Sequence, residues 1–180
     1  SEKIKKNQKK KLQRKNSLIS LKKNIDELYD LIYQVVTTYS KKVHANPLNL
    51  FGKKCFSQSD EDGITIEIFK RLNNLKSGFF LELGVGDGTE NNTLILLSLG
   101  WKGFWVGGSD LAFETSSSKK LKFYKNWITK ENILSIINKG LNYLKVKELD
   151  LISVDLDGND FHIVEKILHS GFLPKVFILE

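Results

Sequence analysis

The sequence predicts an α/β fold: a Rossmann-like, mostly parallel sheet with helices on both faces, preceded by a long N-terminal amphipathic helix. Three observations support this prediction. Apolar strand signals alternate with helical periods throughout residues 46–180, an apolar run at 79–83 leads directly into a glycine-rich turn, and apolar residues repeat by heptads over 18–39. Strands that alternate with helices of this length imply right-handed crossovers and a parallel sheet.

The expected elements of the α/β region follow in order along the chain. A cluster of acids at 59–62 precedes a helical period that runs to Leu72, as at a helix N-terminus. Short apolar runs predict strands at 79–83, 103–106, 123–128, 149–155 and 176–179. Helices are predicted between them at 92–99, 113–121, 130–138 and 160–169. In such sheets, ligands bind beyond the carboxyl ends of the strands.

The positive charge of the chain is concentrated near its N-terminus. The net charge is +7 at pH 7, and residues 1–16 account for all of it, with eight Lys or Arg and one acid, Glu2. Because the rest of the chain is neutral, a nucleic-acid partner is not expected for the α/β domain. Residues 1–16 are predicted to be a disordered basic tail that makes at most peripheral, electrostatic contact with an acidic membrane surface.

Residues 17–45 are predicted to form one amphipathic helix with a heptad repeat. Its seam consists of Leu18, Leu21, Ile25, Leu28, Ile32, Val35 and Tyr39. Tyr29, Leu31 and Val36 widen the apolar stripe beyond a narrow seam. A coiled coil that makes a homo-oligomer through residues 18–39 and docking on the same chain both remain open. Asn46-Pro47 ends the helix, and the α/β domain is assigned to residues 46–180.

The location of the protein is inferred from what its composition lacks. No apolar run approaches the roughly 20 residues that cross a bilayer, and no signal-peptide pattern is present. The single cysteine, Cys55, has neither a disulfide partner nor a metal-binding pattern around it. We therefore expect a soluble protein in a reducing compartment, the cytoplasm.

The glycine-rich turn is the strongest ligand-binding signal. Glu82 ends a strand and is followed by Gly84, Gly86 and Gly88, whose backbone can adopt positive φ and approach a ligand closely. A dinucleotide turn has the spacing Gly-x-Gly-x-x-Gly, which would place its third glycine at Thr89. The carboxylates of Glu82, Asp87 and Glu90 would repel a pyrophosphate but suit ammonium and hydroxyl groups. The turn therefore favours S-adenosylmethionine, with a dinucleotide oxidoreductase as a weaker alternative.

A second cluster of acids follows the strand predicted at 149–155. Asp155 and Asp157 lie near the expected carboxyl edge of the sheet, and Asp160 is placed to cap the next helix. The spacing of Gly158 does not match a calcium-binding EF-hand loop. No metal site is predicted, although an oxygen-ligated metal of another kind is not excluded by spacing.

Four motifs, taken in order, resemble one family. They are Phe56-Ser-Gln-Ser-Asp-Glu-Asp-Gly-Ile64, Phe80-Leu-Glu-Leu-Gly-Val-Gly-Asp-Gly88, Asp150-Leu-Ile-Ser-Val-Asp-Leu-Asp-Gly158 and Pro174-Lys-Val-Phe-Ile-Leu-Glu180. Their order and spacing resemble those of the FkbM-like S-adenosylmethionine-dependent methyltransferases. The resemblance implies a class I methyltransferase fold and transfer of a methyl group to a hydroxyl of a small-molecule or glycan acceptor. It also implies two further strands and a helix, so the sheet is expected to be incomplete at Glu180.

The resemblance also implies roles for individual residues. The expected cofactor-binding residues are Gln58, Glu82, Gly84, Gly86, Asp87, Gly88, Asn92, Asp110 and Asp155. Asp110 is included because Gly107 and Gly108 occupy the place where the family has an acid for the ribose hydroxyls. Asn91, Asn92 and Thr93 have two interpretations, because this run can contact a cofactor or simply begin a helix.

Transfer to a hydroxyl is helped by a group that accepts its proton. Asp155, Asp157 and His162 are the candidate catalytic bases. A different class of function is also consistent with the sequence: a non-catalytic module that keeps the cofactor fold and uses the heptad helix and the basic tail for assembly.

Overall fold

The computed structural model describes residues 2–179, with side chains described from Lys10 onward. The chain divides into two compact units, Ser1–Leu50 and Phe51–Glu180. The α/β unit therefore begins slightly later than its expected start at residue 46.

The first unit is dominated by one helix. Helix α1 (Glu2–Val43) is 42 residues long and is followed by the short 3-10 helix η1 (Pro47–Phe51). Because α1 includes residues 2–16, the structure corrects the prediction that this basic segment is a disordered tail. Lys, Gln, Arg and Leu favour helix, and no Gly or Pro occurs before Pro47 to interrupt it. The predicted boundary between residues 16 and 17 is therefore not a structural boundary.

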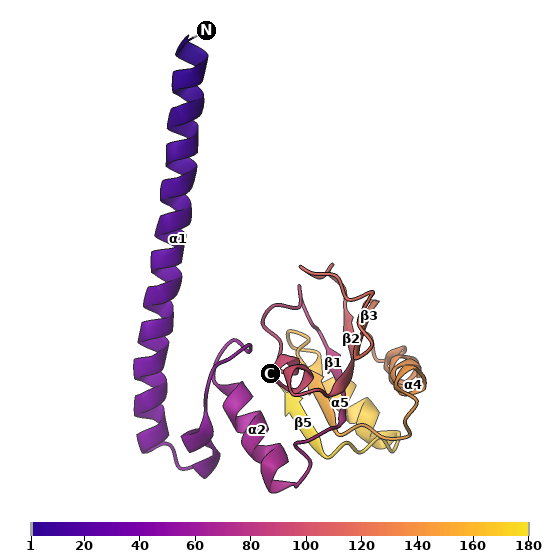
Figure 1. Ribbon diagram of the computed structural model, residues 1–180. Coiled ribbons are helices and arrows are strands. Elements are labelled where there is room, and N and C mark those ends of the chain that lie inside the picture. Colours follow the sequence, from indigo (N-terminus) through magenta and orange to yellow (C-terminus); the bar gives the residue numbers. More distant parts are fainter. Residues whose placement is uncertain (1, 180) are drawn as a thin grey trace. The chain divides into compact units, whose positions relative to one another are not determined.

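The second unit contains one open sheet of parallel strands (Figure 1). Its strands are β1 (Phe79–Leu83), β2 (Lys102–Gly107), β3 (Leu121–Lys125), β4 (Leu151–Val154) and β5 (Val176–Leu179). They are arranged in the order β3-β2-β1-β4-β5, and every pairing is parallel. The predicted α/β fold with a parallel sheet is confirmed. The five strands begin and end close to the positions expected from the sequence.

Helices cover both faces of the sheet, as predicted. On one face, the buried cluster includes Phe69 of α2 (Glu61–Arg71) and Leu96 of α3 (Leu94–Ser98). On the other face, α4 (Ile133–Leu144) and α5 (Asp160–His169) contribute Ile137 and Ile167 to the larger cluster. Burying such side chains supplies roughly 1.5–3 kcal/mol each, which holds the helices against the sheet.

The region between β2 and β3 differs from the prediction. Residues 113–121 were expected to form a helix, but residues 108–120 form turns and bends. Three consecutive serines, Ser116 to Ser118, compete with helix formation because their hydroxyls bond to nearby backbone groups. Ser118 does this, since its hydroxyl accepts hydrogen bonds from the amides of Lys120 and Leu121.

Candidate functional site

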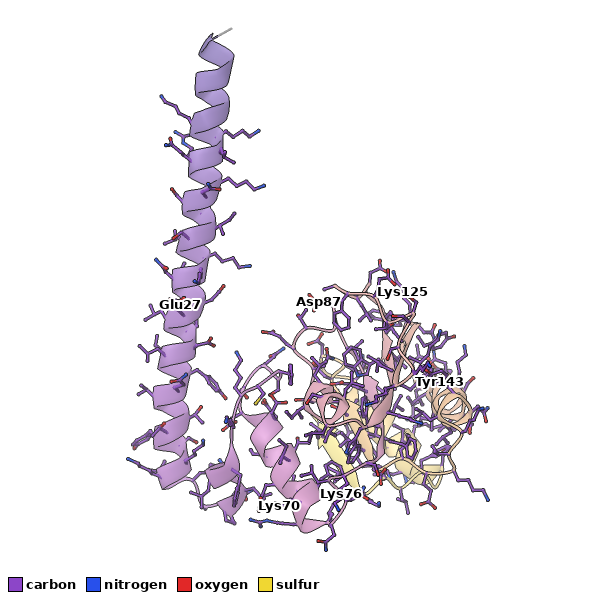
Figure 2. The ribbon with its side chains drawn as sticks, viewed as in Figure 1. Glu27, Lys70, Lys76, Asp87, Lys125 and Tyr143 are labelled. Atoms are coloured by element: carbon purple, nitrogen blue, oxygen red, sulfur yellow. The ribbon has the colours of Figure 1, made fainter. Side chains whose placement is uncertain are left out.

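The candidate site lies at the carboxyl ends of β1 and β4. The chain leaves β1 towards β2 and β3 on one side, and β4 and β5 lie on the other, so β1 and β4 flank the point where the strand order reverses. Ligands of open parallel sheets bind in the crevice at such a switch point. Figure 2 shows Asp87 and Lys125 at this end of the unit, opposite Lys76, which precedes β1.

The three glycines after β1 all have positive φ, but their surroundings differ. Gly84 (φ 91°) has no room for a side chain, because a Cβ there would lie 1.6 Å from the Asp155 carbonyl oxygen. Gly86 (φ 51°) has open space around its Cβ position, with nothing within 4 Å. A Cβ at Gly88 (φ 85°) would meet Leu111 and other apolar side chains. Gly84 therefore allows β1 and β4 to approach, Gly86 leaves space for a ligand, and Gly88 serves packing.

Most of the expected cofactor-binding residues surround one hollow of about 180 Å³. Those that line it are Gln58, Glu82, Gly84, Gly86, Asp87, Asn92 and Asp155. Three distant segments supply them: the loop before α2, the turn after β1 and the end of β4. The hollow is smaller than a typical site for a whole cofactor, which occupies about 300–1,000 Å³. It has the size of one polar end of such a molecule.

Glu82 is buried beneath the turn and is held by several donors. Its carboxylate accepts hydrogen bonds from the Asn92 amide at 2.9 Å and from the Thr93 hydroxyl at 2.5 Å. The indole N–H of Trp105 in turn donates to the Thr93 hydroxyl at 2.8 Å. Burial raises the pKa of Glu82 to about 7, outweighing the hydrogen bonds, which lower it. Glu82 therefore ties the start of α3 to the sheet and can change its protonation near neutral pH.

Asp87 is arranged differently, at the exposed tip of the turn. Its Oδ1 accepts hydrogen bonds from the Thr89 hydroxyl at 2.6 Å and from the Thr89 amide at 3.0 Å. These bonds lower the pKa of Asp87, so its carboxylate remains charged beside the open space at Gly86.

A buried acid that sequence analysis did not assign to the site positions Gln58. Asp62 is fully buried, and its Oδ2 accepts hydrogen bonds from the amides of Cys55, Phe56 and Ser57. These bonds fix the loop that brings Gln58 to the hollow. The only signal in the sequence was the run of acids before the helical period, which is equally typical of an ordinary helix N-terminus.

Asn91 and Thr93, for which the sequence left a cofactor contact and a helix start both open, also belong to the site. Asn91 lines the hollow, and the Nδ2 of its side chain donates a hydrogen bond to the Val85 carbonyl at 3.3 Å. Its Oδ1 is buried and has no hydrogen-bond partner among the described residues. Thr93 links Glu82 to Trp105. Both residues precede α3 as Asn91-Asn92-Thr93, a run that sequence alone cannot distinguish from a helix start.

Four expected site residues do not line the hollow. Gly88 is buried against apolar side chains, and Asp110 is exposed and paired with Lys125 at 2.6 Å. Asp157 lies at φ 51° in the exposed turn before α5. His162 lies on α5 and lines a separate open hollow of about 470 Å³ with the exposed Trp127.

The exposure of Trp127 sets it apart from the other two tryptophans of the chain. Trp101 and Trp105 are fully buried, whereas Trp127 is 77% exposed. It follows the end of β3, where Asn132 donates a hydrogen bond to its carbonyl at 2.8 Å.

Asp160 is not the expected cap: its carboxylate accepts hydrogen bonds from the preceding amides of Leu156 and Gly158.

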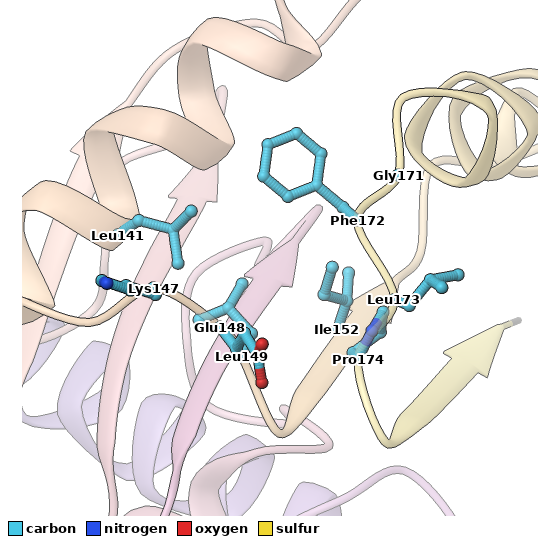
Figure 3. Close-up of a pocket in the computed structure, with 9 residues that line it drawn as sticks. All are labelled: Leu141, Lys147, Glu148, Leu149, Ile152, Gly171, Phe172, Leu173 and Pro174. Carbon is cyan, nitrogen blue, oxygen red and sulfur yellow. The ribbon is translucent and has the colours of Figure 1, made fainter.

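A third hollow lies at the opposite end of the sheet. Figure 3 shows it between the end of α4, the start of β4 and the connection from α5 to β5. Its volume is about 210 Å³, and its walls are mostly apolar, with Leu141 and Phe172 on two of them. It lies near the amino end of β4, away from the edge where a parallel sheet binds ligands.

The described part of the chain contains neither a cluster of metal ligands nor a membrane-spanning helix. Within it, no group of three or more His, Cys, Asp or Glu side chains is placed to hold a metal ion. Among the helices of the same residues, none is both long and apolar enough to cross a bilayer.

Comparisons with known proteins do not place the chain in a family. A scan against protein-family models and a search of the curated proteins both give no match.

The contrast between Gly84 and Gly86 gives a first prediction. We expect Gly84→Ala to lower the free energy of unfolding by about 3 kcal/mol or more, because its Cβ would overlap the Asp155 carbonyl. Gly86→Ala should cost only about 1–2 kcal/mol, the penalty for positive φ in a non-glycine residue. Urea denaturation of the two variants measures this difference. Equal losses would contradict the assigned roles.

The buried Glu82 gives a second prediction. Its pKa is higher in the folded state (about 7) than its ordinary value of 4.5, so the folded state binds more protons between these values. Stability should therefore fall as pH rises from about 4.5 to 7, by roughly 3 kcal/mol from this group. Glu82→Gln should remove this fall, as measured by denaturation at several pH values.

The control for this measurement is Glu90→Gln, which changes an exposed acid that lines the same hollow. We expect it to keep the pH dependence of the wild type. A Glu82→Gln protein whose stability still falls over this pH range would show that another group is responsible.

Proposed function

We propose that the chain is an S-adenosylmethionine-dependent methyltransferase that acts on a hydroxyl of a sugar or another small acceptor. The observation that carries the proposal is the open, side-chain-free space at Gly86, bordered by carboxylates at the switch point of the sheet. Glu82, Asp87, Glu90 and Asp155 line this hollow, and no Lys or Arg is among its described lining residues. Such a site attracts an ammonium group and repels a pyrophosphate.

The residues of the hollow fit the amino-acid end of the cofactor. Its ammonium would lie near Asp87 and Asp155, and the Gln58 side chain can donate hydrogen bonds to its carboxylate. The turn at Gly84 and Gly86 presents backbone groups without a shielding Cβ. When bound, the cofactor supplies a methyl group on a positively charged sulfur.

The remaining contribution of the protein is to position the acceptor and receive its proton. Asp155 is the best-placed base, because it is the only one of the three candidates that lines the described hollow. Asp157 and His162 are exposed, and His162 belongs to the neighbouring hollow at the same strand edge. Orienting the acceptor hydroxyl can supply much of the rate acceleration, since a bound near-attack geometry removes the entropy cost of encounter.

A second candidate function is a non-catalytic assembly module, and the end of β2 favours it. Gly107 and Gly108 offer no side chain to the ribose hydroxyls, and Asp110 is already paired with Lys125. A ribose that used Asp110 would therefore share it with the Lys125 ammonium. A cytoplasmic location is part of the methyltransferase proposal and is supported by the single exposed Cys55.

Calorimetric titration with S-adenosylmethionine tests the proposal directly. We expect the wild-type protein to bind it and to show no binding of NAD. Gly86→Arg should abolish binding, because its side chain would occupy the open space over the turn. The melting temperature should fall by roughly the several degrees that positive φ costs any non-glycine residue, and by no more, because nothing lies within 4 Å of the added Cβ.

Gly171→Arg is the matched control for this variant. Gly171 also has positive φ (82°) and open space around its Cβ position, but it lines the hollow at the opposite end of the sheet. This variant should bind S-adenosylmethionine like the wild type. A folded wild-type protein that binds neither molecule would favour the assembly module, and binding of NAD alone would favour an oxidoreductase.

A further inference from the structure

We propose that α1 pairs with α1 of a second copy of this chain in a parallel two-stranded coiled coil. The proposal is independent of the enzymatic one. It begins from the exposure of the seam: Leu18, Leu21, Ile25, Leu28, Ile32, Val35 and Tyr39 are between 43% and 67% exposed. An amphipathic helix is stable mainly through burial of its apolar face, and no described residue of the unit that contains α1, Ser1–Leu50, covers this stripe.

The spacing of the seam points to a helical partner rather than a flat surface. Its residues alternate in steps of three and four without a break from Leu18 to Tyr39. A period of 3.5 residues drifts around a straight helix, which has about 3.6 residues per turn, so it stays continuous only when two helices supercoil. A flat surface imposes no such period.

The residue types in the central part of the seam, from Leu21 to Ile32, favour two parallel strands. With Leu18 at heptad position a, Ile25 and Ile32 occupy a positions, while Leu21 and Leu28 occupy d positions. β-Branched residues at a with Leu at d favour parallel dimers over larger bundles. No polar residue interrupts the a and d positions between Leu18 and Tyr39.

The positions beside the seam agree with a parallel, in-register pair. Leu31 lies at position g and would face Val36, at position e, of the second copy. Of the three apolar residues that widen the stripe, Leu31 and Val36 would therefore cover one another, whereas Tyr29, also at position e, would face Asn24 of the second copy. Most residues on the outer side are polar, and there Lys23 at f and Glu27 at c form an ion pair at 3.6 Å (Figure 2 labels Glu27).

The same register predicts where the coiled coil begins. One heptad before Leu18 and Leu21, Lys11 and Arg14 occupy the a and d positions. In a parallel pair these cations would meet their own copies, which is unfavourable. We therefore expect the seam to start at Leu18 and the two basic segments to remain apart.

Sedimentation equilibrium of the full chain tests the proposal with two matched variants. The wild type should have twice the 20.6 kDa mass of the chain. Ile25→Lys, at an a position, should lose the dimer. Ile19→Lys makes the same change at the outer b position, where the side chain is 59% exposed, and should remain dimeric. Near-ultraviolet circular dichroism, which reports on buried Trp101 and Trp105, should stay unchanged in both variants.

Oxidative cross-linking tests the orientation of the helices. Cys55 is first replaced by serine, and Leu21→Cys is introduced near one end of the seam. A parallel pair brings the two copies of residue 21 together, so a disulfide-linked dimer should form. Lys23→Cys, at the outer f position, should form none. An antiparallel pair would leave both variants unlinked.

Three outcomes would overturn the proposal. A wild type that is monomeric at every concentration would mean that the stripe is covered within the same chain. A monomer that binds vesicles of anionic phospholipid through this helix would assign the stripe to a membrane surface. Equal loss of the dimer in Ile19→Lys and Ile25→Lys would show that the heptad seam is not the interface.

Discussion

The close approach of β1 and β4 at Gly84 is the constraint on which the candidate site depends. The Asp155 carbonyl lies where any Cβ at Gly84 would be, so only glycine lets the two strand ends meet at this distance. That contact brings Asp155 beside the turn and leaves the open space at Gly86 between them. A side chain at position 84 would push apart the ends of β1 and β4, which carry the acids, even if every other residue were kept. The site is therefore built by backbone geometry, and we propose that its carboxylates select a positively charged ligand.

Buried acids hold this arrangement from two sides. Glu82 links β1 to the start of α3 and, through Thr93, to Trp105 on β2. Asp62 gathers three backbone amides of the loop that carries Gln58. Such buried carboxylates are tolerated because they accept several hydrogen bonds, and removing a partner would leave an unpaired buried group. The acids of the glycine motif thus divide into a structural one below the turn and exposed ones that face the hollow.

The sequence predicted the strands and the carboxyl edge that carries the glycine turn well, because apolar runs that end in glycine or acids mark both the core and this edge. It could not divide the glycines by role, since the overlap at Gly84 and the packing at Gly88 come from residues distant in the chain, Asp155 and Leu111. It also missed Asp62, whose hydrogen-bond partners depend on a loop conformation with no local signature. The basic residues before Asn16 indicated disorder by charge, yet their helix propensity continues α1 through them. Features that depend on neighbouring residues could therefore be predicted from the sequence, whereas contacts between segments distant in the chain could not.

The central claim is that the turn after β1 binds a positively charged methyl donor rather than a dinucleotide. Amide chemical shifts of the isotope-labelled protein, followed during separate titrations with S-adenosylmethionine and NAD, test it residue by residue. The account predicts that S-adenosylmethionine shifts the amides of Gly84, Gly86 and Asp87, leaves Gly171 unchanged, and that NAD shifts none of them. Shifts of the turn with NAD alone, or shifts with S-adenosylmethionine confined to residues outside this hollow, would contradict it.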